Sequence, residues 1–369
     1  MQEKIIFDAV IIGAGVVGLS IAKFYSEIGK SVVVLEKESR SGEGVSSRNS
    51  GVIHAGMYYP TGSLKSALCI EGNRLLYDYA KVKNISCRKI GKYIIASKED
   101  ELEKLNKLYN QGLSSGVSLE MIAKEKIQNL YPDLVLAGAI YSPESGIIDV
   151  PELVTALEGD IQHNKGVISL NTAFISATKS QDNFKITCND GNEFKINSKM
   201  LINSSGLNSE INTRKIFSLD DKYNLPINLA KGHYFKYSGK HPFNTLIYPL
   251  SNEFSQGIHA GFDLSGQLRF GPDINWISNL DFSFDESVKD NFIDSIQQYW
   301  PDMNPDKLQP DYVGIRPKIQ NPNEKMRDFS ILDSKIHGVE GLINLQGIES
   351  PGVTSSLAIG RFVTKLLQK

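Results

Sequence analysis

The hydrophobic pattern of the chain opens with a strand, a glycine-rich turn and a helix. Residues 5–12 form an almost unbroken apolar run rich in β-branched side chains, which is typical of a parallel strand buried on both faces. A helical pattern follows and closes at Gly29, a residue type that commonly ends helices. Residues 31–36 form a second apolar run, so the N-terminal segment predicts a βαβ unit.

The rest of the chain alternates between helical and extended patterns, without repeats or low-complexity tracts. The turn at residues 189–191, Asn-Asp-Gly, is a strong signal for a hairpin between two strands. Further helices are predicted over residues 63–80, 99–110, 120–129, 285–300 and 353–367, and strands over 88–97, within 166–202, within the antiparallel region 228–273, and at 341–347.

The order of these patterns predicts two interleaved domains. A Rossmann-like α/β domain is expected to use residues 1–80, 143–225 and 313–369. Residues 81–142 and 226–312 are expected to form an α+β substrate domain built on an antiparallel sheet.

Charge and cysteine content exclude several function classes. The 40 Lys and Arg residues balance 42 Asp and Glu residues, so the chain has no basic field that would attract nucleic acid. Cys69, Cys87 and Cys188 match neither a disulfide framework nor a metal-binding pattern, which favours a reducing, cytoplasmic location and no metal. No apolar run is long enough to span a bilayer, and peripheral association with the inner face of the membrane stays open.

The turn after the first strand carries a dinucleotide-binding fingerprint. Residues 13–18, Gly-Ala-Gly-Val-Val-Gly, match G-x-G-x-x-G, a pattern that is weak alone but here follows a strand and opens a helix. Gly13 would permit the tight turn, Gly15 the approach of a pyrophosphate, and Gly18 close helix–strand packing. Glu36, which ends the second strand, would accept a hydrogen bond from a ribose hydroxyl.

Two features favour FAD over NAD. The chain has one such fingerprint, whereas a flavoenzyme that uses NAD(P)H usually carries a second nucleotide-binding unit. The segments expected to support the fingerprint are spread over the whole chain, as a long cofactor lying across the protein would require.

Several motifs along the chain carry a resemblance to a known family. The chain resembles the D-amino-acid oxidase superfamily of flavoproteins over its full length, and within it the L-2-hydroxyglutarate dehydrogenase/oxidase family. The motifs stand at residues 49–59 (NSGVIHAGMYY), 63–65 (SLK), 205–209 (SGLNS), 257–259 (GIH), 270–272 (FGP), 314–317 (GIRP) and 350–356 (SPGVTSS).

The resemblance implies positions for the parts of FAD. Glu36 and Lys37 would lie near the adenosine, and Phe174 would touch the adenine through its backbone. A helix N-terminus following Gly347 would face the pyrimidine edge of the flavin, where its dipole stabilises negative charge. The full set implied for the cofactor is Gly13, Gly15, Val16, Val17, Gly18, Glu36, Lys37, Ser47, Asn49, Ser50, Phe174, Ser205, Gly206, Gly347, Gly352, Val353 and Thr354.

The same resemblance suggests how a small carboxylate substrate is bound. Arg316 would grip the substrate carboxylate, because a planar guanidinium forms a bidentate clamp on such a group. A dicarboxylate would need a second cation, for which Lys65, Lys231 and Arg74 are candidates. Three aromatic residues would orient the substrate or else belong to the core: Tyr58, Tyr59 and Tyr248.

Oxidation of a hydroxy acid also requires a base for the hydroxyl proton. His54 and His259 match histidines of the hydroxyglutarate family, and the sequence favours neither over the other as the base. The leading hypothesis is therefore FAD-dependent oxidation of a small 2-hydroxy acid, with oxygen or a quinone as electron acceptor. The alternatives are an oxidase of a small amino or imino acid, and a flavin-binding module without turnover.

Overall fold

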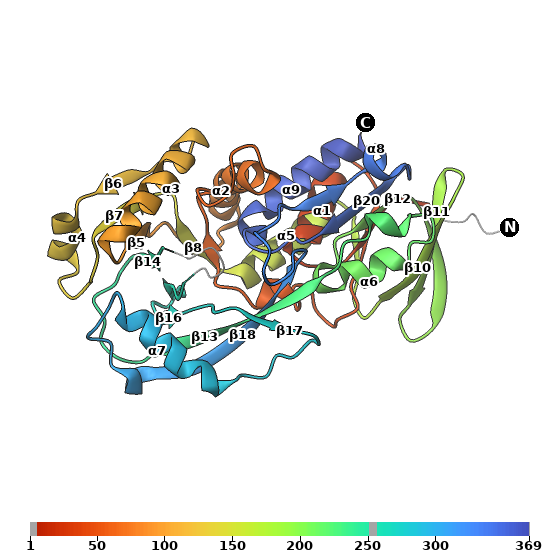
Figure 1. The fold of residues 1–369 in the computed structure, drawn as a ribbon. Helices are drawn as coiled ribbons and strands as arrows, with labels where there is room; N and C mark the ends of the chain where they lie inside the picture. Colours follow the sequence, from red (N-terminus) through yellow and green to blue (C-terminus); the bar gives the residue numbers. More distant parts are fainter. Residues whose placement is uncertain (1–5, 251–256, 369) are drawn as a thin grey trace.

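A computed structural model describes residues 6–250 and 257–368 of the chain (Figure 1). Residue 5, where the first predicted strand begins, and residues 251–256 of the predicted antiparallel region lie outside the described residues. The described elements form two large sheets and one small sheet.

The first sheet has a parallel centre that begins with the N-terminal strand. β1 (Ile6–Ile12) pairs in parallel with β2 (Val32–Leu35) on one side and with β12 (Glu193–Asn203) on the other. The parallel order extends through β9 (Val167–Ser169) next to β2 and β20 (Leu342–Gln346) next to β12. The predicted βαβ unit is confirmed, since helix α1 (Val16–Glu27) connects β1 and β2.

Four helices share a hydrophobic core with one face of this sheet. Besides α1 they are α2 (Leu64–Lys83), α5 (Val150–His163) and α9 (Gly352–Leu367). The opposite face carries a second core around Phe184 and Leu201. Strands β10 (Ala173–Ser180) and β11 (Asn183–Asn189) continue the same sheet beyond β12 and contribute side chains to this core. Strand β19 (Ser330–Leu332) pairs with β20, and its Ile331 belongs to the core on the helix side. Two short helices follow strands of this sheet in the chain, α6 (Ser209–Arg214) after β12 and α8 (Ser334–His337) after β19.

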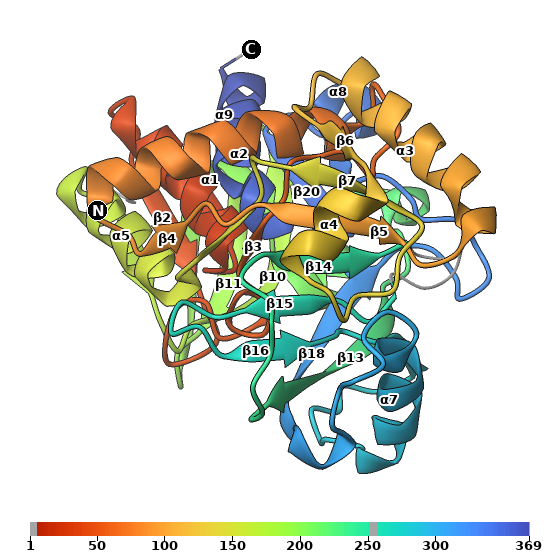
Figure 2. The same ribbon diagram turned by 90° about the vertical axis from the view of Figure 1, so that its left-hand side faces the viewer.

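The second sheet carries its own core and its own helices. Strands β13 (Asn228–Tyr237) and β18 (Leu308–Lys318) pair along their whole length and extend toward the first sheet (Figure 1). Helix α7 (Lys289–Gln297) lies at the far end of this sheet from α1 and α2, and its Phe292 packs on Phe235 of β13 (Figure 2). The strands are β5 (Lys92–Ala96), β6 (Glu120–Ile122), β7 (Gly138–Ser142), β13 (Asn228–Tyr237), β14 (Leu246–Pro249), β15 (Ala260–Phe262), β16 (Leu268–Phe270), β17 (Asn275–Ile277) and β18 (Leu308–Lys318), and the helices α3 (Leu102–Ser114), α4 (Lys124–Leu130) and α7 (Lys289–Gln297).

The secondary structure differs from the sequence prediction at two places. Residues 120–122, predicted as helix, form β6 because Ile122 is buried opposite Ala139 of β7. The strand predicted over 88–97 breaks at Gly91, whose φ of 70° suits glycine. Its first part is β4 (Cys87–Arg88), which joins β3 (Val52–Ile53) and β8 (Gly146–Ile148) in the small sheet.

One pairing differs from the predicted strand direction, and another crosses an expected domain boundary. β14 pairs with β5 in parallel, although this region was predicted to be antiparallel. β18 crosses the boundary expected at residue 313, since residues 313–318 pair with β13. The α/β fold with an interleaved α+β sheet is otherwise as predicted.

We expect Gly360→Ala to lower the free energy of unfolding by roughly 1–3 kcal/mol, the usual cost of overpacking a core. A Cβ at Gly360 of α9 would lie 2.6 Å from the backbone oxygen of Ser20 in α1, so the two helices would have to separate. Urea denaturation measures the change. The matched control is Gly159→Ala in the exposed part of α5, where a Cβ meets nothing within 4 Å. The control should be neutral or stabilise by up to about 1 kcal/mol, and equal losses in both variants would contradict the packing argument.

Candidate active site

A cavity of about 750 Å³ opens where the parallel strands of the first sheet end. Ile12 of β1 and Leu35 of β2 line it from that sheet. Tyr248 of β14 and Arg316 of β18 line it from the second sheet. The cavity therefore lies between the two sheets, at the carboxyl ends of the strands where open α/β sheets bind ligands.

Most residues singled out in the sequence line this cavity. Gly18, Tyr58, Tyr59 and Lys65 are not among the lining residues. The lining residues that the sequence predicted are Gly13, Gly15, Val16, Val17, Glu36, Lys37, Ser47, Asn49, Ser50, His54, Phe174, Ser205, Gly206, Tyr248, His259, Arg316, Gly347, Gly352, Val353 and Thr354.

The three glycines of the fingerprint occupy different environments. A Cβ at Gly13 would lie 2.9 Å from the carbonyl oxygen of Ser204, and Gly13 has a φ of 98°. A Cβ at Gly18 would lie 2.0 Å from the carbonyl oxygen of Gly13, so Gly18 allows the helix to pack on the turn. Gly15 faces the cavity, and a Cβ there would meet the hydroxyl of Ser46 at 3.1 Å.

Glu36 holds the glycine-rich turn in place. One carboxylate oxygen accepts a hydrogen bond from the Ala14 N–H at 2.8 Å, and the other accepts from the Glu38 N–H at 3.0 Å. Lys37 is exposed at the rim and pairs with Glu38 at 2.9 Å. Phe174 buries its ring in the core of the first sheet, so its backbone is the part that can face a ligand.

Two helix N-termini point at the cavity. α1 begins at Val16 and α9 begins at Gly352, and neither has a side-chain cap or an acidic residue in its first turn within the part of the chain that the structure describes. The Val16 N–H donates to the Ser46 hydroxyl at 3.1 Å. The remaining N–H groups and the helix dipoles favour negative charge at both places.

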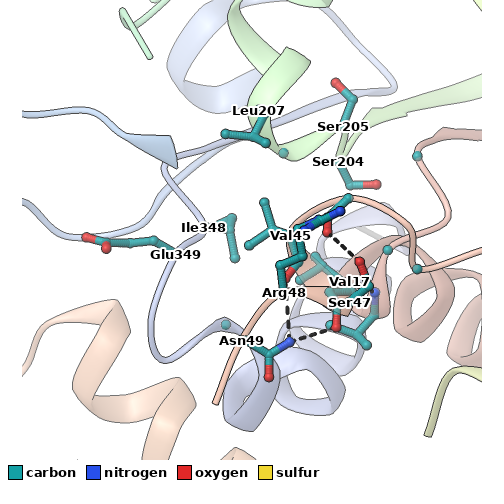
Figure 3. A pocket seen from close by; sticks show the side chains of 18 of the residues that line it. Val17, Val45, Ser47, Arg48, Asn49, Ser204, Ser205, Leu207, Ile348 and Glu349 are labelled. Atoms are coloured by element: carbon teal, nitrogen blue, oxygen red, sulfur yellow. Dashed lines mark hydrogen bonds between the residues drawn. The ribbon is translucent and has the colours of Figure 1, made fainter. Parts of the chain in front are cut away.

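The loop that precedes His54 is shaped by its own side chains (Figure 3). The Asn49 amide donates to the Ser46 carbonyl at 2.7 Å and accepts from the Gly51 N–H at 2.8 Å. The Ser47 hydroxyl donates to the Glu43 carbonyl at 2.9 Å. These side chains therefore fold the loop, which presents Ser47, Asn49 and Ser50 to the cavity.

The last turn before α9 contributes a buried carboxylate that the sequence analysis missed. The Glu349 carboxylate lies 2.8 Å from the Lys318 ammonium and 3.2 Å from the Lys65 ammonium. Its side chain points away from the loop of residues 45–49 (Figure 3). Burial by itself raises the pKa of Glu349, but Lys65 and Lys318 outweigh burial and hold this pKa at about 2. The sequence held one signal for this buried carboxylate. Arg316 and Lys318 are two residues apart in a strand, so both cations share one face, where an acidic partner is expected.

Arg316 sits beside this cluster without a carboxylate of its own. Its guanidinium donates to the backbone oxygen of Asp273 at 2.6 Å. It forms no ion pair with any residue in 6–250 or 257–368. Two buried lysines were candidates for the second cation that a dicarboxylate needs, and both are paired. Lys65 pairs with Glu349, and Lys231 pairs with Asp281 at 2.8 Å.

The two predicted histidines lie in the same wall of the cavity. The His259 ring stacks on Tyr248, with 3.6 Å between ring centroids and 12° between planes. The His54 backbone N–H donates to the Thr354 hydroxyl at 3.0 Å, which ties the loop to α9. Burial lowers the pKa of His54 well below its ordinary value of 6.5, and Lys92 and His259 lower it further.

The two remaining predicted tyrosines lie behind this wall. Tyr59 is buried, and Tyr58 is partly buried against the core of the second sheet. Burial raises the pKa of both phenols well above the ordinary value, so both are neutral. Their contact with substrate, like that of Lys65, stays a prediction.

The chain belongs to the DAO family, described as FAD dependent oxidoreductase, which matches residues 8–366. The resemblance, the enzyme class and the FAD cofactor predicted from the sequence are thereby confirmed.

Individual relatives and a solved structure agree with the family. The chain is 35% identical to L-2-hydroxyglutarate dehydrogenase, mitochondrial, of Arabidopsis thaliana, over 96% of this chain and 82% of that one. It is 28% identical to glycerol 3-phosphate dehydrogenase of Caloramator mitchellensis, over 98% of this chain and 74% of that one. The fold matches L-alpha-glycerophosphate oxidase from Mycoplasma pneumoniae with FAD bound, with a TM-score of 0.88 and 22% identity over 99% and 95% of the two chains.

The residues present fit FAD. One cavity is lined by Glu36, by His54 and His259, and by the N-termini of α1 and α9, so it offers contacts to both ends of a long dinucleotide. At Gly15 a side chain would occupy the cavity beside the first helix end. Among the described residues, no helix combines the length and the hydropathy needed to cross a membrane.

We expect Gly15→Val to abolish FAD binding and to leave the apoprotein folded. The added side chain would enter the space beside the α1 N-terminus, where the pyrophosphate is expected, while inside the protein it meets only a hydroxyl. Flavin absorbance after refolding with excess FAD measures binding, and thermal melting tests the fold. Gly159→Val, in an exposed part of α5, is the control and should retain full flavin content. Full flavin occupancy in Gly15→Val would show that the cofactor lies elsewhere.

Proposed function

We propose that the chain oxidises a small 2-hydroxy acid of the L-2-hydroxyglutarate type. The observation that carries the proposal is the placement of Arg316, without a carboxylate partner among the described residues, in one cavity with His54 and His259. When bound, FAD supplies the acceptor for the hydride that leaves the substrate carbon. The relative from Arabidopsis thaliana, named L-2-hydroxyglutarate dehydrogenase, supports this substrate class.

Arg316 would bind the substrate carboxylate through the N–H groups that Asp273 leaves unused. The hydrogen bond to the Asp273 backbone holds the guanidinium in one orientation, which reduces the entropy lost on binding. Together with Lys65, Lys318 and Glu349, Arg316 makes the surrounding cluster net positive. A net positive, largely buried cluster favours an anionic substrate.

His54 or His259 would accept the hydroxyl proton. The low pKa of His54 keeps its ring neutral at neutral pH, and a neutral imidazole has a lone pair for the proton. The Nδ1 atom of His54 is buried and has no hydrogen-bond partner among the residues that the structure describes. His259 is held by its stack on Tyr248, so the wall presents two rings in fixed orientations.

The cofactor-binding residues and the division into domains follow from the same proposal. The α1 N-terminus with Gly13, Gly15 and Ser205 would hold the pyrophosphate, and Glu36 the adenosine ribose. The α9 N-terminus would face the pyrimidine edge of the flavin. We infer that the cofactor domain uses residues 1–80, 143–225 and 313–369, with β18 shared between the domains. A cytoplasmic location and oxygen or a quinone as electron acceptor stay predictions.

A substrate panel tests the proposal. Purified protein loaded with FAD is mixed without oxygen with L-2-hydroxyglutarate, glycine or glycerol 3-phosphate, and the absorbance of oxidised flavin is followed. Loss of absorbance with the hydroxy acid supports the proposal. Loss with glycine alone favours an amino-acid oxidase, and loss with the phosphate ester alone favours the activity in the name of the Caloramator mitchellensis relative. No loss with any acid favours a flavin-binding module without turnover.

We expect Arg316→Lys to weaken substrate binding by about tenfold or more, because an ammonium cannot reproduce the bidentate fork. The substrate concentration for half-maximal flavin reduction measures the effect. Flavin content should be normal, since the proposal assigns Arg316 to the substrate and not to the cofactor. Arg74→Lys on α2 is a control at an arginine that does not line the cavity. Unchanged binding in Arg316→Lys would place the carboxylate at another cation.

We expect His54→Ala or His259→Ala to slow anaerobic flavin reduction by roughly 100-fold or more, the lower range of a general-base contribution. In the unaltered protein the rate should be constant around neutral pH and fall as pH drops below the depressed pKa of His54. The loss should shrink at high pH, where hydroxide substitutes in part. Single-turnover reduction across a pH series measures both effects. If neither variant slows reduction by tenfold, no histidine acts as base and the amine-oxidase alternative becomes the better one.

A further inference from the structure

Lys92 is a buried lysine to which the proposed mechanism gives no role. It begins β5 in the second sheet, and its side chain is 0% exposed. Its ammonium nitrogen has no hydrogen-bond partner among the residues that the structure describes. A buried ammonium without a partner is costly, so its retention calls for a function at this position.

The surroundings of Lys92 connect it to the histidine wall. β5 pairs in parallel with β14, and Lys92 is opposite Leu246 in the register. Tyr248, two residues further along β14, therefore lies on the same face of the sheet as Lys92. The Lys92 nitrogen lies 4.6 Å from the centre of the Tyr248 ring, on which His259 also stacks.

A second aromatic ring and helix α2 also belong to the surroundings of Lys92. The Lys92 nitrogen lies 4.9 Å from the centre of the Tyr58 ring, which follows His54 in the same loop. Cys69 of α2 donates to the backbone oxygen of His54 at 3.6 Å. On the β7 side Lys92 is opposite Ser142, which is neutral.

None of these neighbours, within the described residues, is an anion at neutral pH. Burial raises the pKa of Cys69 to about 12. It also raises the pKa of Tyr58 and of Tyr248 above the ordinary value. The titratable groups around Lys92 therefore comprise neutral rings, a neutral thiol and the two histidines, and nothing there offsets a second positive charge.

We propose that Lys92 is a positioning residue that keeps His54 unprotonated, so that His54 is ready to accept the substrate proton. The charge of Lys92 acts across a dry space in which two positive charges repel strongly. Because His54 is the base only under the proposed function, the catalytic part of this proposal rests on that function. Its electrostatic part concerns the protein alone.

The protonation equilibria give the sign of the effect. Burial lowers the pKa of Lys92 to about 7, so Lys92 carries its charge below that pH. Protonation of His54 would occur in this same acidic range, because its ordinary pKa is 6.5. Lys92 is therefore charged at any pH at which His54 could become charged, and it shifts the protonation of His54 to lower pH.

The test compares Lys92→Met with Lys92→Arg, which remove and retain the charge. In Lys92→Met, the acid limb of the pH profile for anaerobic flavin reduction should move to higher pH by roughly one pH unit. It should stay in place or move down in Lys92→Arg. Lys23→Met is the matched control, because Lys23 is also buried but pairs with Glu27 on α1, away from the cavity. The control should leave the limb unchanged.

A second readout does not depend on turnover. The imidazole proton resonances of His54 and His259, assigned with His54→Gln and His259→Gln, are titrated by NMR in the apoprotein and the FAD-loaded protein. In Lys92→Met the His54 titration should move to higher pH by a similar amount. If Lys92→Arg does not fold, Lys92→Gln provides a second neutral variant that must match Lys92→Met.

The outcomes separate the two proposals. An acid limb that survives both histidine substitutions overturns the histidine base, while the NMR titration still tests Lys92. A limb that disappears in His54→Gln but does not move in Lys92→Met overturns the role of Lys92 and leaves the base in place. An unchanged His54 titration in Lys92→Met also overturns the role of Lys92.

Discussion

Unsatisfied backbone N–H groups at two helix ends are the constraint on which the site depends. α1 and α9 both begin at the cavity, and within the described chain neither helix is capped by the side chain of its own N-cap residue. The Ser46 hydroxyl accepts from the Val16 N–H of α1. A helix end that lacks a cap needs water or a ligand to complete its hydrogen bonds. The glycine contacts at residues 13 and 18 bring α1 close enough to the sheet for its end to face that space. The architecture thus provides two regions of positive potential along one cavity, which suits a cofactor that is negative at both.

The second sheet supplies the chemistry that the first sheet lacks. β18 carries Arg316 to the cavity, and β14 carries Tyr248 with its stacked His259. The parallel pairing of β14 with β5 joins strands that are far apart in sequence, and it places Lys92 behind the histidine wall. Under the proposed function, substrate contacts and cofactor contacts would therefore come from different sheets, and the loop of residues 45–54 would connect them.

The charges in the site are arranged unevenly. Glu349 neutralises part of the Lys65 and Lys318 charge, so the region around Arg316 stays net positive. Around Lys92 the described residues offer aromatic faces and a neutral thiol in place of an acid. The first arrangement favours binding of an anion, and the second disfavours further protonation. Both effects are strong because the groups are buried and the local dielectric is low.

The sequence by itself determined the βαβ unit, the fingerprint and the hairpin at Asn189, because these depend on short-range periodicity and on glycine at turns. Through the family resemblance it also singled out His54, His259 and Arg316, which all line one cavity. Only the tertiary structure decided that residues 120–122 form a strand, that β14 runs parallel to β5, and that Glu349 joins Lys65 to Lys318. Such outcomes depend on which distant segments meet, and a local pattern carries no information on its eventual neighbours. Lys92 is the clearest case, because in the sequence it is one lysine before an apolar run, and in the fold it is buried against the Tyr248 ring on which His259 stacks.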